Sequence, residues 1–345
     1  MTASAKSRQG DPASTTAVSR RTALISGAVL VLAAGLTISS IVTSDDPPKP
    51  TPRLQTSTTK APDPALIKLD EELSGAVNLS VAFAGSVQVL DRELRAGTLA
   101  GAELARRAVA FEDQVTQTLA AVAELKVPRG AEQVKVYATE AMVLYQISTR
   151  LLQGADGVAD TGRSGLAVRV KLLADRVFDR ARIALDIATN GAPSASGQRV
   201  LTSPAIPDFA AEAPGTGAGP GVAPASERPL GEAAWHTEVR RQAVAVAGII
   251  DSIDWTSPST DDAEAAKQQT ALVRSTDALA ISLPELTLTE AARTLRLATA
   301  VIEQALAARR LGATEPAGAL LDAGRRIWAI AADDAETDPT LGTKR

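Results

Sequence analysis

The chain has 345 residues, a formal net charge of −4, no cysteine and only 3% aromatic residues. The absence of cysteine excludes disulfides, thiolate metal sites and a cysteine nucleophile. The mild acidity gives no indication of nucleic-acid binding, and so few aromatic side chains leave little material for platforms that stack bases or sugars.

An uncharged segment, residues 22–43, predicts a membrane-spanning helix. A helix of this length reaches about 33 Å, and the hydrocarbon core of a bilayer is about 30 Å thick. Two arginines precede the segment and two aspartates follow it, so we expect residues 1–21 to be cytoplasmic and the bulk of the chain to be extracytoplasmic. The alternative is a signal peptide that is cleaved, which leaves a secreted protein.

Residues 44–63 contain five prolines among threonines and serines. A segment of this composition cannot bury a core, and prolines favour an extended backbone. We therefore expect a stalk that separates the next domain from the membrane.

Residues 64–190 predict four amphipathic helices, because apolar residues recur at every third or fourth position. Asp63 and Pro64 form a favourable N-cap and first helical residue, and Asn190-Gly191 is typical of a left-handed helix end. Four such helices with short connections most simply form an up-down bundle.

Residues 191–230 are rich in glycine, proline, alanine and serine, which predicts a disordered linker. Residues 231–332 then predict a second bundle of about four helices, and residues 333–345 a disordered tail. The expected fold is thus all-α, with an N-terminal transmembrane helix and two antiparallel helical bundles joined by a linker.

Two further patterns concern the second bundle. Thr287-Leu288-Thr289-Glu290 has the form of a capping box that opens its third helix. Both sets also have a proline break between their second and third helices, at Pro128 and Pro284, which suggests an internal duplication.

Arginines are the most noticeable candidates for a binding surface. Arg169, Arg176 and Arg180 fall on one stripe of the fourth predicted helix. Because guanidinium groups bind carboxylates and phosphates in a bidentate manner, the stripe is a candidate contact for an anionic polymer or an acidic partner. The alternative is a solvated face that is balanced by the neighbouring Asp175, Asp179 and Asp186.

Aromatic residues supply a second candidate. Tyr137 and Tyr145 on the third predicted helix could line a small pocket in the first bundle, and the three tryptophans could do the same in the second: Trp235, Trp255 and Trp328. The alternative is that these side chains fill the core.

The sequence offers no pattern for chemistry. His236 is the single histidine and stands four residues after Glu232, whereas a metal site needs three or four ligands. Adjacent carboxylates point about 100° apart on a helix, so they form no catalytic pair. We predict no catalytic, cofactor-binding or metal-binding residues.

The leading hypothesis is a membrane-tethered extracytoplasmic protein of a bacterial cell envelope that binds or scaffolds and has no catalytic activity. Its partners would be the membrane, crossed once, and an envelope protein or anionic polymer, but no nucleic acid. The alternatives are an exported ligand-sensing or solute-binding bundle with a pocket between helices, and an enzyme of unknown type.

Overall fold

The structure is a computed structural model that describes residues 63–99, 101–155, 161–212 and 226–334. All of these belong to one compact unit, Thr59–Arg345. The predicted cytoplasmic tail, the predicted transmembrane helix 22–43 and the stalk up to residue 62 lie outside the described residues. None of the helices that the structure describes is long and apolar enough to cross a membrane.

The prediction of an all-α protein is confirmed, since 79% of the described residues are helical and 2% are in strands. A first set of long helices comprises α1 (Pro64–Arg95), α2 (Gly101–Glu124), α3 (Glu132–Gln153) and α4 (Thr161–Asn190). A second set comprises α7 (Glu232–Asp251), α8 (Asp262–Ala278), α9 (Leu286–Arg310) and α10 (Thr314–Asp334).

Local signals placed several helix ends correctly. The Asp63 side chain accepts a hydrogen bond from the backbone N–H of Ala65 at 2.9 Å, and Pro64 is the first residue of α1. Gly191, directly after α4, has a φ of 70°. Because side chains with a Cβ rarely adopt this left-handed conformation, glycine is the favoured residue there.

The range 191–230 contains regular structure that the linker prediction did not include. Among its described residues are α5 (Ala195–Thr202), α6 (Phe209–Glu212) and the short strand β1 (Arg228–Pro229), which pairs in parallel with β2 (Ile281–Ser282). Residues 213–225 lie outside the described part.

The predicted capping box at residues 287–290 is wrong. Helix α9 begins at Leu286 with Glu285 as its N-cap residue, and Glu285 makes no capping bond through its side chain. The Thr289 hydroxyl instead bonds to the loop before the helix, where it accepts from the N–H of Leu283 at 2.9 Å. The motif was misleading because Glu290 serves a partner from the other helical set, as described below.

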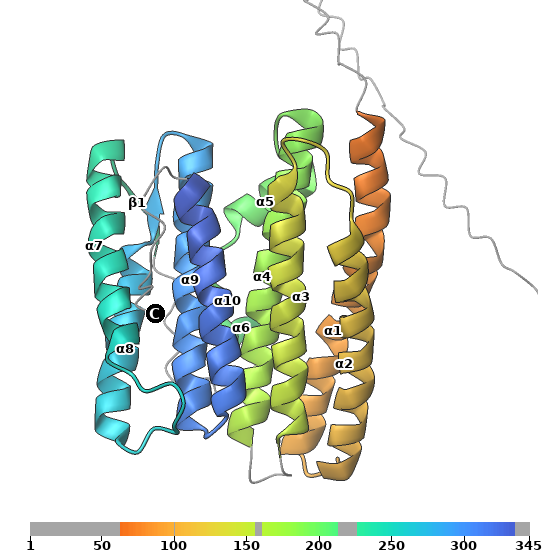
Figure 1. Cartoon of the computed structure of the whole chain (residues 1–345), viewed down its shortest axis with the longest axis vertical. Coiled ribbons are helices and arrows are strands. Elements are labelled where there is room, and N and C mark those ends of the chain that lie inside the picture. The colour runs from red at the N-terminus through yellow and green to blue at the C-terminus, as the bar shows by residue number, and fades with distance from the viewer. Residues whose placement is uncertain (1–62, 100, 156–160, 213–225, 335–345) are drawn as a thin grey trace, which may run out of the picture. The chain divides into compact units, whose positions relative to one another are not determined.

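The two sets are in contact. Helices α3 and α4 form a hairpin, α9 and α10 form another, and the hairpins pack together through α4 against α9 and α3 against α10 (Figure 1). We call this contact the junction. Pairs α1/α2 and α7/α8 lie on opposite sides of it. Exchanging α3 with α9 and α4 with α10 converts one junction contact into the other, but the α1/α4 contact of the first set has no comparable α7/α10 contact in the second, so the duplication stays a prediction.

A hydrophobic cluster of buried residues extends through both sets. Independent folding of the two predicted bundles stays a prediction.

Within the second hairpin the helices approach closely at Gly324 of α10, where an added Cβ would lie 2.6 Å from Cγ1 of Ile302 and 3.2 Å from the carbonyl oxygen of Ala298.

We predict that Gly324→Ala destabilises the protein by about 1–3 kcal/mol, because the methyl group overpacks the α9–α10 contact. Gly318→Ala in the same helix is the matched control, since no atom lies within 4 Å of its added Cβ. It should stabilise by roughly 0.5–1 kcal/mol through helix propensity alone. Urea unfolding of both variants checks the prediction, and equal effects would contradict it.

Candidate functional site

The predicted arginine stripe of α4 points into the molecule rather than to solvent. The side chain of Arg180 is 3% exposed and that of Arg176 is 16% exposed. Arg169 donates from Nε to Oε1 of Gln304 on α9 at 2.9 Å. A fully solvated face is therefore excluded for Arg180, and both Arg169 and Arg180 contact α9 at the junction.

Arg180 belongs to a chain of ion pairs that crosses the junction. It pairs with Glu290 of α9, which also pairs with Nη1 of Arg293 at 3.1 Å. Arg293 in turn makes two bonds to the carboxylate of Glu227, at 2.6 and 2.9 Å. Burial, with a further contribution from Arg293, lowers the pKa of Arg180 to about 10, so the guanidinium still carries its charge at neutral pH.

Arg176 continues the charged group toward α6. Its Nη2 lies 2.5 Å from Oε1 of Glu212, and its Nη1 lies 3.8 Å from Asp179. Burial raises the pKa of both carboxyl groups. Glu212 is the last described residue before positions 213–225 and Glu227 is the second described residue after them, so the described chain on each side is attached to α4 or α9 by an arginine–glutamate pair.

The candidate tyrosines lie in the core of the first set. Tyr137 is 4% exposed and Tyr145 is fully buried. The Tyr145 hydroxyl donates to Oδ1 of Asp175 at 2.5 Å, and Lys171 lies 2.6 Å from Oδ2 of the same carboxylate. The ring of Tyr145 contacts Phe83 edge-on, with 5.3 Å between centroids. Tyr145 thus joins an aromatic cluster to a buried ion pair.

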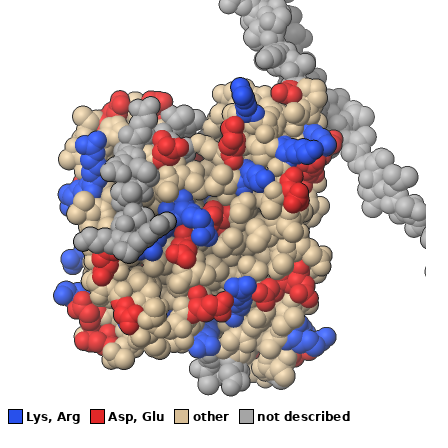
Figure 2. Space-filling model, in the orientation of Figure 1, with Lys and Arg blue, Asp and Glu red and all other residues tan. Residues whose placement is uncertain are grey.

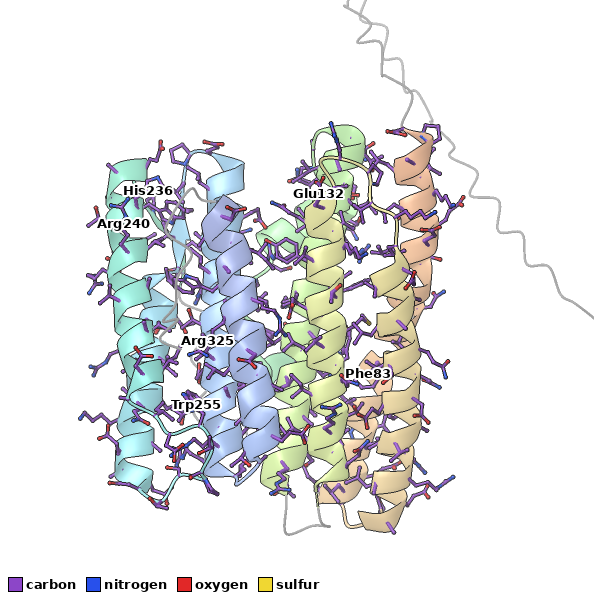
Figure 3. All side chains as sticks on the ribbon, viewed as in Figure 1. Phe83, Glu132, His236, Arg240, Trp255 and Arg325 are labelled. Carbon is purple, nitrogen blue, oxygen red and sulfur yellow. The ribbon has the colours of Figure 1, made fainter. Side chains whose placement is uncertain are left out.

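The candidate aromatic residues of the second set are also buried or half-buried. Trp235 and Trp328 are fully buried, and half-buried Trp255 donates from its indole nitrogen to the carbonyl of Ile250 at 3.0 Å. His236 lies 3.8 Å from Glu232 on α7 (Figure 3). Among the described residues, no group of three or more His, Asp or Glu side chains is arranged to hold a metal ion.

Glu303 on α9 is a partly buried carboxyl group that sequence patterns did not indicate. Burial raises its pKa to about 7, opposed by a hydrogen bond with Gln269 of α8 and by the charge of Arg169. Its burial arises from helices that are distant in sequence, so no local motif could have revealed it.

The part of the chain that the structure describes includes a cavity and a groove away from the junction. A cavity of about 230 Å³ between α1, α4 and α5 is lined by apolar residues and by four charged ones, namely Asp70, Asp179, Arg182 and Asp186. A more open groove of about 370 Å³ lies between α1 and α2. Its lining includes Glu72, Gly75, Leu79, Gln117 and Ala121. Neither lining includes Tyr137 or Tyr145.

The groove borders an uncharged surface. Helix α2 carries no charge from Gln114 to Ala123, although several residues of this stretch are exposed: Gln114, Thr116, Gln117, Ala120 and Ala121. Figure 2 shows the area as a tan region over α2 and neighbouring α3, with charged side chains above and below it. We call residues 114–123 of α2 the uncharged face.

No protein-family model matches the chain, and no curated protein or solved structure is significantly similar to it. The function is therefore argued from the residues and their geometry.

We predict that Arg180→Gln destabilises the protein by about 3 kcal/mol, because removal of one partner leaves Glu290 buried with a single cation. Arg182→Gln, on the same helix but with a side chain that is 46% exposed, should change stability by less than about 0.5 kcal/mol. Denaturant unfolding measures both. Equal, small effects would show that the buried pair does not matter for folding.

We also predict an unusual pH dependence from Glu303. Because its pKa is higher in the folded than in the unfolded state, its contribution favours folding at low pH and is lost as the pH rises through about 7. From pH 5.5 to 8, the native protein should lose on the order of 1–2 kcal/mol more stability than Glu303→Gln does. Exposed Glu132→Gln is the control, and an identical pH profile for Glu303→Gln and native protein would refute the prediction.

Proposed function

We propose that this protein is a membrane-tethered, extracytoplasmic binding or scaffolding protein of a bacterial cell envelope, and that the uncharged face of α2 contacts a partner protein. The tether rests on the apolar segment 22–43 and on the charges that flank it. The binding role rests on the surface of α2.

The observation that carries the proposal is the lack of charge on an exposed helix surface. Lysine, glutamate and aspartate are depleted at the centre of a protein–protein interface relative to the remaining surface. Here the depleted stretch of α2 adjoins a groove whose α1 side includes Gly75. No atom lies within 4 Å of a Cβ added to Gly75, so the groove is open at that point to a side chain of a partner.

The cavity between α1, α4 and α5 favours a second candidate, a solute-binding protein. Three carboxylates and one arginine line it together with apolar residues such as Leu73 and Ile183. A small ligand with a positive charge and an apolar part would complement this lining. An anionic polymer would not complement this lining.

The test of the partner-binding proposal is site-specific photocrosslinking in the native envelope. A photoreactive amino acid at exposed Gln117 of the full-length protein should give a discrete adduct with another protein. Ala121→Arg should reduce the adduct yield about tenfold or more, because an interface that excludes water must then bury an unpaired charge.

Ala110→Arg is the matched control. It places the same side chain at an exposed position of the same helix, outside the uncharged face, and should leave the yield unchanged. An adduct that is equally insensitive to both arginines, or no adduct at Gln117, would refute the proposal.

A further inference from the structure

Polar pairs cross the junction between the two helical sets at several levels. Between α3 and α10, Arg326 donates from Nε to Oε1 of Glu140 at 2.6 Å, and Arg150 pairs with Glu315 at 3.0 Å. Between α4 and α9, the pairs are Arg180 with Glu290 and Arg169 with Gln304. Contacts between domains that move relative to each other are typically more polar than a core.

The closed junction also leaves buried polar atoms unsatisfied. Among the described residues, the buried side-chain atoms without a hydrogen-bond partner include Oε2 of Glu140 and Nε of Arg180. Both residues form ion pairs across the junction, whereas other such atoms lie on α7 and α8. A buried polar atom without a partner destabilises the arrangement that buries it, and exposure to water relieves this cost.

The two described ends of the range 191–230 contact different helical sets. The N-terminal part of this range contacts the first set, where Ser194 donates to Asp186 of α4 and Gln88 of α1 donates to the carbonyl of Glu212 at 3.2 Å. Its C-terminal part contacts the second set, through β1 and through the bonds from Arg293 to Glu227. Each end can therefore stay with its own set.

We propose that the two helical sets open at the junction as two units, and that opening exposes the arginine stripe of α4. In the closed form Arg180 is buried against Glu290. In the open form Arg169 and Arg180 face solvent, and the stripe becomes a surface that an anionic partner can reach. The junction acts as a conformational switch that hides this surface.

Distance measurement between spin labels tests the proposal. The native chain has no cysteine, so labels attach only to introduced residues. Ala110→Cys on α2 and Ala266→Cys on α8 place one label on an exposed position of each set. Pulsed electron paramagnetic resonance on the full chain should detect a second, longer distance. Its population should increase about tenfold in Arg326→Gln, which leaves Glu140 buried without its cation.

Two controls make the outcome decisive. Labels at Ala110 and Val136, both in the first set, should keep one distance in every variant, and exposed Lys267→Gln on α8 should not change the populations. If Arg326→Gln does not fold, Glu315→Gln removes an exposed junction pair and should increase the longer population to a smaller extent. One unchanged distance between the sets in the native protein and in the folded variants would overturn the proposal.

Discussion

Burial of charge at the junction is the constraint around which this structure is arranged. Arg180 carries a full charge into an environment where an isolated ion costs several kcal/mol, and its side chain is 3% exposed. The cost is offset by a succession of partners in which Glu290 bridges Arg180 and Arg293, and Arg293 holds Glu227. These residues come from α4, α9 and the segment before β1. The position of each element therefore depends on the others.

The apolar part of the core explains why such pairs are needed for a unique arrangement. Many of its buried residues are alanines, for example Ala167, Ala174 and Ala181 on α4 and Ala298, Ala305 and Ala308 on α9. Small side chains permit close helix approach but bury little apolar area each, and similar alanine faces can slide past each other at low cost. We infer that charged pairs at defined positions select one register for α4 against α9. This role is attested for buried polar groups in other helical assemblies.

Features that act through the local backbone could be predicted from the sequence, and features that act through distant partners could not. Asp63, Pro64 and Gly191 determine helix ends through their own conformations and nearest hydrogen bonds, so the local sequence was sufficient to predict these ends. Glu290 was misread as part of a cap because its partner, Arg180, is 110 residues away in sequence. The arginine stripe was located correctly on one helix face, but which face meets solvent depends on α9. No sequence pattern indicated the raised pKa of Glu303 either, because the groups that surround it come from distant parts of the chain.

Composition and packing account for only part of the uncharged face of α2. An alanine-rich chain would replace charged surface residues with alanine, yet the exposed stretch contains Gln114, Thr116 and Gln117, which are polar without charge. Packing accounts for only part of the stretch, since Val115 and Val122 are buried and Thr116 accepts a hydrogen bond from Gln146 of α3 at 3.2 Å. Neutral polar side chains can be desolvated at a moderate cost when a partner supplies hydrogen bonds, whereas an ion cannot. Such a surface remains hydrated in the free protein and can still be covered by a partner.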